Sequence, residues 1–303
     1  MKDGRDRTVW SEYYSEFPYF SEELIRDGCH PRKMVHEVAA EKAIVLVHGL
    51  SDSPYFLSAV GDFFHFELSY DVYLPLLYGH GLKDPDGARG ASLEEWKKNV
   101  RFAIHTAAGS GRFLSVGGLS TGGTLSLYMG CNDPLVTGDV YLFAAALGLK
   151  EGWLGIAGSV KEFLLRLPLI LPANNRAPLI GSNPYRYDYV SLNGARELIH
   201  LIVELGGVIE SAISGGHFPQ HIFSVSTEYD DVVSLKAIDK LREVAEPGNF
   251  SQYIIPENLQ VEHASIVLED PIFAIDAEAG DSPLEKANPE FFEMMEAIKE
   301  FEQ

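Results

Sequence analysis

The chain has 303 residues and a hydrophobic fraction of 46%, which suits one large domain with a substantial core. No apolar run reaches the roughly 18 residues that a membrane-spanning helix needs, so stable membrane insertion is not expected. Its 44 acidic and 24 basic residues give a formal net charge of −20, which argues against nucleic acid and anionic membranes as partners and is compatible with a solvated acidic surface or with salt adaptation.

Residues 1–30 are polar and aromatic without a clear period, which predicts an N-terminal extension. They begin with charged residues and lack the apolar region of a secretory signal. The two cysteines, Cys29 and Cys131, are too few for a disulfide framework and show no metal-binding spacing. These features predict a cytoplasmic protein.

Strands and helices alternate along the rest of the chain. Residues 43–47 form a continuous apolar run rich in β-branched side chains, as expected for a strand buried on both faces. Ser92, with Glu95 three residues later, predicts the N-cap of a helix that runs to about Ala107. The alternation predicts an α/β fold with a mostly parallel sheet flanked by helices. Predicted strands are 33–38, 43–48, 70–77, 112–117, 139–146, 221–226 and 250–255, and predicted helices are 54–66, 92–107, 121–129, 234–244 and 289–301.

Residues 148–217 interrupt this alternation. They contain a nearly continuous apolar run at 163–171 and a helical segment near 195–205. We expect them to form a cap inserted between two parts of the core, 1–147 and 218–303, with extra packing on the sheet as the alternative. If the apolar run lies over the site, it favours ester substrates with an aliphatic acyl chain, whereas it otherwise only packs the cap onto the sheet.

Gly118-Leu119-Ser120-Thr121-Gly122 is the one G-x-S-x-G sequence in the chain. A predicted strand leads into it and a predicted helix follows, which is the context of a nucleophile elbow. In this tight turn the positions two before and two after the serine have no room for side chains, hence the glycines. The motif predicts Ser120 as a nucleophile, and an ordinary glycine turn is the alternative.

Acyl transfer requires backbone amides that point toward the developing oxyanion. The Thr121 amide, at the start of the helix after the nucleophile, is one expected donor. The second is expected in the loop after the strand at 43–47, where Gly49 permits a close approach and Leu50 supplies the amide. His48 is expected to hold this loop in place. The candidate caps of the helix that follows the loop are Asp52 and Ser53.

On such a sheet the acid and then the histidine follow the serine in chain order. His263 is the one histidine after Ser120 that lies in a loop beyond the last predicted strand. The acid is expected in the loop before that strand, where Asp230 is the first choice and leaves Asp231 free to cap the next helix. Asp231 is the second choice of acid and Glu228 the third. The remaining histidines after the serine are His200, His217 and His221.

Together these residues predict a serine hydrolase. His263 takes the Ser120 proton, Asp230 fixes the imidazole tautomer, and the Leu50 and Thr121 amides hold the oxyanion. Water then clears the acyl-enzyme. This chemistry requires no metal and no organic cofactor.

The motifs that follow one another between residues 43 and 266 are Val47–Pro54, Tyr78–Gly81, Leu93–Trp96, Gly118–Gly123 and the loops that hold Asp230 and His263. In this order they resemble the α/β-hydrolases of the bacterial carboxylesterase, monoacylglycerol lipase and lysophospholipase-like branch. The resemblance implies a triad at Ser120, Asp230 and His263 and an oxyanion hole at Leu50 and Thr121. The family usually has Asp-x-Pro-Gly-His-Gly where this chain has Leu-Leu-Tyr-Gly-His-Gly at 76–81, a departure that affects a structural loop.

The resemblance leaves the substrate open. Hydrolysis of monoacylglycerols, lysophospholipids or simple esters is the first hypothesis. The same triad acting on peptide, thioester or carbon–carbon bonds is the second, because the cap and not the triad selects the substrate. A non-catalytic ligand receptor is the third. Epoxide and haloalkane hydrolysis are excluded, since those reactions need a carboxylate at the elbow.

Overall fold

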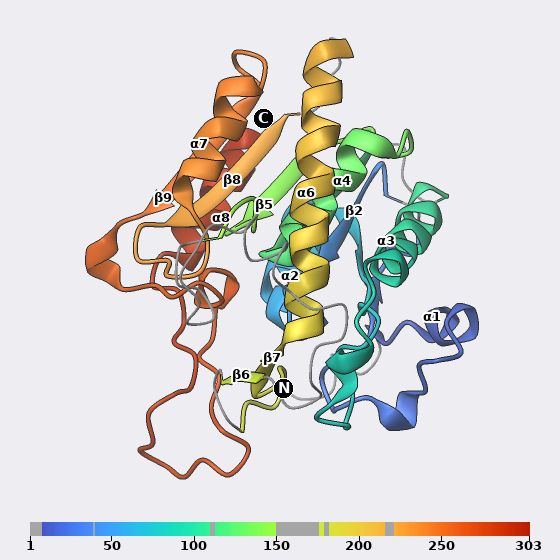
Figure 1. The fold of residues 1–303 in the computed structure, drawn as a ribbon, viewed down its shortest axis with the longest axis vertical. Coiled ribbons are helices and arrows are strands. Elements are labelled where there is room, and N and C mark those ends of the chain that lie inside the picture. The colour runs from blue at the N-terminus through green and yellow to red at the C-terminus, as the bar shows by residue number, and fades with distance from the viewer. Residues whose placement is uncertain (1–7, 39, 110–112, 150–175, 179–181, 216–220) are drawn as a thin grey trace.

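The computed structural model describes residues 8–38, 40–109, 113–149, 176–178, 182–215 and 221–303 (Figure 1). Within them, a seven-stranded sheet has the order β1-β3-β2-β4-β5-β8-β9. β1 runs antiparallel to β3, and the other neighbouring strands are parallel. The predicted α/β fold with a mostly parallel sheet is therefore confirmed. The strands are β1 (Arg32–Met34), β2 (Lys42–Val47), β3 (Tyr70–Leu74), β4 (Phe113–Leu119), β5 (Val140–Phe143), β8 (Ile222–Thr227) and β9 (Phe250–Ile255), with a separate antiparallel pair of β6 (Arg176–Pro178) and β7 (Tyr189–Ser191).

Helices cover both faces of the sheet (Figure 1). Phe64 and Phe301, from one helix before β3 and one at the end of the chain, both pack against the ring of Tyr141 on β5. The central strands are buried on both faces, which explains their continuous apolar sequences. The helices are α1 (Ser11–Glu16), α2 (Ser58–Phe66), α3 (Leu93–Ala108), α4 (Thr121–Asn132), α6 (Leu192–Gly215), α7 (Leu235–Val244) and α8 (Phe291–Phe301).

Three strands are shorter than predicted. β3 ends at Leu74 because Pro75 has no amide hydrogen to continue the ladder. β1 ends at Met34, and the His36 amide donates instead to the carboxylate of Asp71 at 2.9 Å. β5 ends at Phe143, since the next residue, Ala144, has φ 43° and turns the chain out of the sheet.

The segment before β1 packs on the domain, which the prediction of an extension missed. Trp10, Tyr13 and Phe17 are buried, with ring centroids 5.4–5.7 Å from that of Phe102 on α3. Aromatic side chains bury large apolar areas even without helical periodicity. The buried aromatic residues of this segment therefore belong to the core, from Trp10 onward.

α6 extends well beyond the predicted segment at 195–205 (Figure 1). Gly206 and Gly207 do not end it, because neighbouring turns continue the amphipathic pattern around them. Polar contacts attach its N-terminal half to α3 and to the turn before it. Glu197 accepts from the Leu93 amide at 3.0 Å, Lys97 pairs with Glu204 at 2.6 Å, and Asn193 donates to the Ala91 carbonyl at 2.7 Å. The apolar run at 163–171 lies outside the described residues.

Ser92 caps α3 as predicted, because its hydroxyl accepts from the Glu95 amide at 3.4 Å. Within the described ranges, no helix combines the length and the apolar character needed to cross a membrane.

Candidate active site

The candidate residues gather at the carboxyl edge of the sheet. The chain leaves β2 toward β3 on one side and leaves β4 toward β5 on the other, so the loops after these adjacent strands diverge. Open parallel sheets bind their ligands at such a point. Val47 and Gly118 are paired across it, and both the loop at 48–53 and Ser120 follow directly.

Ser120 lies in a strained turn between β4 and α4. Its φ of 53° and ψ of −115° are rare for a residue with a side chain, and such a conformation costs about 1–3 kcal/mol. A Cβ at Gly122 would overlap the Val47 carbonyl oxygen, and one at Gly118 would overlap the backbone of Gly122. The two glycines of the motif are therefore required by the close approach of three backbone segments.

Backbone hydrogen bonds hold this turn. The Ser120 amide donates to the Phe143 carbonyl at 2.9 Å, and its carbonyl accepts from the Ala146 and Thr124 amides, each at 3.1 Å. The early end of β5 makes one of these bonds possible, because the turn at Ala144 brings the Ala146 amide to the Ser120 carbonyl. None of these bonds uses the serine hydroxyl, so that group stays available for chemistry.

The two expected oxyanion donors are unpaired. In the part of the chain that the structure describes, no acceptor takes a hydrogen bond from the Leu50 or the Thr121 amide. A Cβ at Gly49 would lie 3.4 Å from the Ser120 Cβ, so the loop that carries Leu50 lies against Ser120. Unpaired amides next to a nucleophile are what an oxyanion hole needs.

Hydrogen bonds of the buried His48 side chain fix this loop. Its Nε2 accepts from the Leu77 amide at 3.1 Å, so Nδ1 carries the proton and donates to the Gly49 carbonyl at 2.9 Å. Burial and the nearby His80 hold the pKa of His48 well below its usual range. A neutral, fully bonded imidazole agrees with the structural role expected for this residue.

Of the two candidate helix caps in this loop, Ser53 holds the N-cap position and Asp52 does not. Ser53 occupies the N-cap of the following 3-10 turn, Pro54–Leu57, without a side-chain hydrogen bond. Asp52 pairs instead with the Arg186 guanidinium, with 3.2 Å between Oδ1 and Nε. The Asp52 carboxylate therefore contacts a distant segment of the chain and does not cap the helix that follows it.

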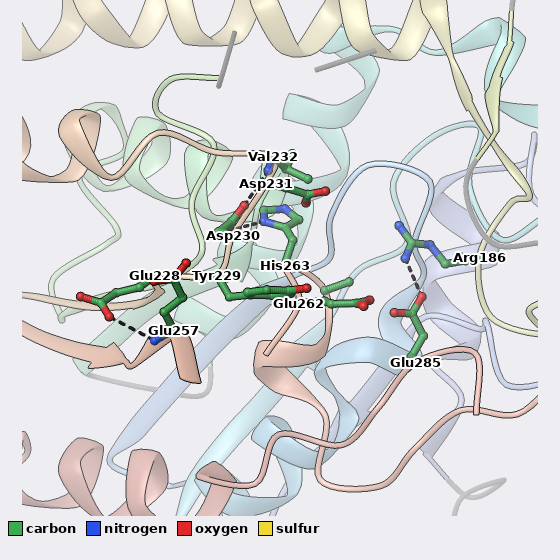
Figure 2. Close-up of a pocket in the computed structure, with 11 residues that line it drawn as sticks. Arg186, Glu228, Tyr229, Asp230, Asp231, Val232, Glu257, Glu262, His263 and Glu285 are labelled. Atoms are coloured by element: carbon green, nitrogen blue, oxygen red, sulfur yellow. Dashed lines mark hydrogen bonds and ion pairs between the residues drawn. The ribbon is translucent and has the colours of Figure 1, made fainter. Parts of the chain in front are cut away.

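The structure brings His263 and Asp230 together (Figure 2). Nδ1 of His263 lies 2.7 Å from Oδ2 of Asp230, and Oδ1 accepts from the Val232 and Val233 amides at 2.8 and 3.0 Å. Burial raises the pKa of Asp230, but His263 and the two amides outweigh that effect and lower it. The carboxylate is thus ionised, and it holds the imidazole with Nδ1 protonated.

Asp231 and Glu228, the other two candidate acids, point elsewhere. Asp231 is exposed and does not cap α7, which begins at Leu235 with Ser234 at its N-cap. Glu228 accepts from the Glu257 amide at 3.1 Å, away from the imidazole (Figure 2). Of the three candidates, Asp230 alone has the geometry of a triad acid.

A chain of contacts relates this pair to Ser120. The Asp52 carboxylate lies over Gly49, next to Ser120, and burial raises the pKa of Asp52 while the charge of His263 lowers it. The Thr227 hydroxyl donates to the Val261 carbonyl at 3.1 Å, which joins the loop of the acid to the loop of the histidine. The structure therefore places the elbow, the loop after β2 and the His263–Asp230 pair in one neighbourhood.

A pocket of about 550 Å³ opens beside His263 (Figure 2). Its lining is rich in carboxylates, with one arginine, so it carries a negative charge near neutral pH. In the described residues, no group of three or more His, Cys, Asp or Glu side chains is arranged to hold a metal ion. The lining residues are Arg186, Glu228, Tyr229, Asp230, Asp231, Val232, Glu257, Glu262, His263, Ala264 and Glu285.

Arg186 and Glu285 were missed in the sequence. They form an ion pair at 2.6 Å, and Arg186 also pairs with Asp52, so three distant segments meet beside the site. Arg186 lies in a Pro- and Asn-rich stretch and Glu285 in a long loop before α8, neither with a motif. No local sequence signal could have identified them, because the pairing exists only in three dimensions.

The sheet order, the strained elbow and the loops at the carboxyl edge are those of the α/β-hydrolase fold. No family model matches the chain. A thermostable monoacylglycerol lipase from Bacillus sp. (strain H-257) is 31% identical over 102 residues, which cover 34% of this chain and 40% of that protein. The match thus spans well under two thirds of the curated relative, and it confirms the resemblance to the monoacylglycerol lipase branch in that part.

Solved structures share the fold at low sequence identity. A metagenome-derived lipolytic enzyme from a study of LipS and LipT has a TM-score of 0.66 at 17% identity, over 91% of this chain and 98% of its own. A soluble variant of monoglyceride lipase from Saccharomyces cerevisiae has a TM-score of 0.60 at 14% identity, over 90% and 89% of the two chains. Est1E from Butyrivibrio proteoclasticus, with ferulic acid bound, has a TM-score of 0.56 at 15% identity, over 92% and 97%.

Proposed function

We propose that the chain is a serine hydrolase that cleaves carboxylic esters. Ser120 is the nucleophile, His263 the base, Asp230 the residue that orients the base, and the Leu50 and Thr121 amides form the oxyanion hole. The observation that carries the proposal is the 2.7 Å contact between His263 and buried Asp230, in the same neighbourhood as a serine in a strained elbow. Ester bonds are supported by the partial match to a monoacylglycerol lipase.

The reaction follows from these positions. His263 Nε2 takes the hydroxyl proton as Ser120 Oγ attacks the acyl carbon, and the carbonyl oxygen becomes an oxyanion. The two free amides donate to that oxyanion, while Asp230 stabilises the imidazolium. His263 then gives the proton to the leaving alcohol, and water attacks the acyl-enzyme by the same steps in reverse.

Labelling with a fluorophosphonate probe and a panel of matched esters, thioesters and amides tests this proposal. We expect covalent labelling at Ser120 and the highest kcat/KM on esters. Lack of labelling in folded protein would contradict a serine hydrolase and favour a ligand receptor. Labelling together with a preference for amides or thioesters would contradict the assignment of ester bonds.

We also propose that residues 148–217 form a cap. β5 and β8 are parallel neighbours in the sheet, so the long connection between them leaves the core and re-enters it at adjacent strands. A Cβ at Gly194, in the first turn of α6, would lie 3.0 Å from the Leu50 side chain, so the inserted segment contacts the loop of the expected oxyanion donor. This position supports a role in choosing the substrate.

The cap leads to a prediction on acyl-chain length. If the apolar run at 163–171 lines the acyl site, each methylene buried there gains up to about 0.8 kcal/mol. We therefore expect kcat/KM on p-nitrophenyl esters to rise from acetate to hexanoate or octanoate. A Leu167→Asp variant is expected to flatten the rise and to spare acetate hydrolysis. If acetate is the best ester of the wild type, this run does not bind the acyl chain.

The acidic pocket leads to a prediction on substrate charge. A phosphate group near this lining meets like charges, so we expect monobutyrylglycerol to be hydrolysed at least about tenfold faster, in kcat/KM, than its glycerol-phosphate analogue at low salt. The difference is expected to shrink in 0.5 M NaCl, because salt screens exposed charges. It is also expected to shrink in the double variant Glu257→Gln/Glu262→Gln, which removes two exposed carboxylates of the pocket. Equal rates on both substrates would contradict a role for the pocket in binding the substrate.

A further inference from the structure

A buried cluster of three charges lies next to the expected oxyanion hole. Arg186 Nη1 donates a hydrogen bond to Glu285 at 2.6 Å, and Arg186 Nε lies 3.2 Å from Asp52 Oδ1 in an ion pair without hydrogen-bond geometry. The side chains of Arg186, Asp52 and Glu285 are 10%, 4% and 1% exposed, respectively. Asp52 belongs to the loop after β2, Arg186 to the segment before β7, and Glu285 to the loop before α8 (Figure 2 shows the Arg186–Glu285 pair). One guanidinium therefore joins three parts of the chain.

The backbone around Arg186 is fixed as firmly as its side chain. Its carbonyl accepts from the Arg26 guanidinium at 2.7 Å, and the next residue, Tyr187, donates its amide to the Ser51 carbonyl at 3.0 Å. The guanidinium carbon also lies 5.5 Å from the centre of the Phe56 ring. The segment is therefore attached to the loop after β2 by its backbone as well as by Arg186.

That loop needs support from outside. Ser51 has φ 65°, a left-handed conformation that is unfavourable for a residue with a side chain. It lies between Leu50, whose amide is free, and Asp52, whose carboxylate is held by Arg186. A strained turn persists only when its surroundings fix it, and here the fixed points next to the strain are the hydrogen bond from the Tyr187 amide to the Ser51 carbonyl and the Asp52–Arg186 pair.

The cluster is a poor source of stability. It has two carboxylates and one cation, and buried ion pairs often contribute nothing net once the loss of hydration is included. Burial raises the pKa of Asp52 to about 6 although Arg186 lies beside it, and Glu285 adds to the increase. Ionised Asp52 therefore costs free energy in the folded protein. Stability alone does not account for the cluster, whereas a role in holding the loop after β2 does.

We propose that Arg186 is a positioning residue, which fixes the Leu50 amide for the oxyanion by holding Asp52 against the segment before β7 and the loop before α8. This inference rests on the proposed function, since the oxyanion role of Leu50 belongs to it. An oxyanion donor acts in the transition state more than in the bound ground state. Displacing it therefore lowers kcat and leaves KM nearly unchanged.

The test compares Arg186→Met and Arg186→Lys with the wild type on a p-nitrophenyl ester. We expect Arg186→Met to lower kcat by about 10- to 100-fold, less than the roughly 10²- to 10³-fold for losing an oxyanion donor because the amide is displaced and not removed, with KM within about twofold. Arg186→Lys is expected to recover part of kcat, because an ammonium restores the charge but not the fork that spans two carboxylates. Unchanged kcat in folded Arg186→Met would overturn the inference.

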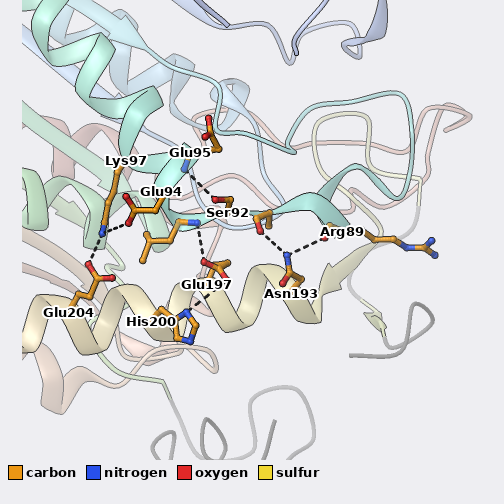
Figure 3. Close-up of polar contacts among 11 residues, drawn as sticks. Arg89, Ser92, Glu94, Glu95, Lys97, Asn193, Glu197, His200 and Glu204 are labelled. Atoms are coloured by element: carbon orange, nitrogen blue, oxygen red, sulfur yellow. Dashed lines mark hydrogen bonds and ion pairs between the residues drawn. The ribbon is translucent and has the colours of Figure 1, made fainter. Parts of the chain in front are cut away.

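Lys97→Met is the matched control. Lys97 is 7% exposed and also pairs with two carboxylates, Glu94 at 3.0 Å and Glu204 at 2.6 Å, but it lies on α3, and its partners lie on α3 and α6 (Figure 3). We expect this variant to lower Tm and to keep kcat. A loss of kcat as large as that of Arg186→Met would mean that removing any buried cation impairs the enzyme, and it would contradict a positioning role.

A third variant covers the case in which Arg186→Met does not fold. Asp52→Asn/Arg186→Met/Glu285→Gln removes all three charges at once, so that none is left buried without a partner. Its kcat is expected to fall as in the single variant, and wild-type kcat in the folded triple variant would overturn the inference. A wild type without labelling or ester hydrolysis contradicts the proposed function itself, whereas an active wild type with an equally active Arg186→Met contradicts only the role of Arg186.

Discussion

Replacement of Ser120 by alanine is expected to abolish ester hydrolysis, with a loss in kcat of order 10⁴-fold or more. The fold is expected to remain, because the bonds that hold the elbow come from the backbone of residue 120 and not from its hydroxyl. Alanine carries a Cβ as serine does, so the steric strain at this positive φ remains. The measurement is kcat on a p-nitrophenyl ester, with Tm recorded for both proteins.

Ser126→Ala is the matched control for this prediction. Ser126 is a buried serine on α4, and its hydroxyl donates to the Gly117 carbonyl at 2.8 Å. The same side-chain oxygen is removed within two turns of the elbow, so any loss of kcat through local distortion appears in this variant too. Ser126→Ala is expected to keep kcat within about threefold. Substantial turnover by Ser120→Ala would contradict the assignment of the nucleophile.

Asp230→Asn is expected to lower kcat by about 10⁴-fold, and Asp231→Asn by no more than about twofold. The Val232 and Val233 amides both donate to Oδ1 of Asp230, so the oxygen of the asparagine must stay on that side. Its NH₂ group then faces Nδ1 of His263 and donates to it. The imidazole proton moves to Nε2, which can no longer take the proton of Ser120.

The kinetics of the two amide variants at several pH values check this reasoning. The two substitutions are at adjacent positions, and each replaces one carboxylate oxygen by an NH₂ group. Each variant is therefore the control for the other. If Asp231→Asn is the more damaging, the acid has been placed one residue too early in the loop. If both variants keep full activity, His263 does not depend on a carboxylate in this loop.

Much of the fold could be predicted because parallel strands that are buried on both faces have continuous apolar sequences. The apolar run of β2 and the strand that leads into Ser120 are continuous, and the residues with chemistry follow at their carboxyl ends. His263 could be chosen among the histidines because it follows the last predicted strand. In a parallel sheet the loop after a strand lies at the carboxyl edge, where the site is expected. The choice between Asp230 and Asp231 was harder, since it depends on which carboxylate the Val232 and Val233 amides fix.

Other features depend on contacts between distant segments. Arg186 has no neighbour in sequence that reveals its two partners, which lie 134 residues before it and 99 residues after it. The aromatic residues before β1 have no period, and they become core only by packing on α3. The predicted helical segment ended near residue 205, but α6 continues through Gly206 and Gly207, which each cost a helix of 24 residues only about 1 kcal/mol.

The connection between β5 and β8, which we propose as a cap, has a consequence for engineering. Such connections look exchangeable, because β5 and β8 pair directly and a foreign segment needs only matching ends. Here the segment also supplies Arg186, whose partners stay behind in the loop after β2 and the loop before α8. A chimera with a new insertion would leave Asp52 and Glu285 buried without their cation. Exchange of this segment is therefore expected to require Asp52→Asn and Glu285→Gln, or an arginine grafted at the matching place.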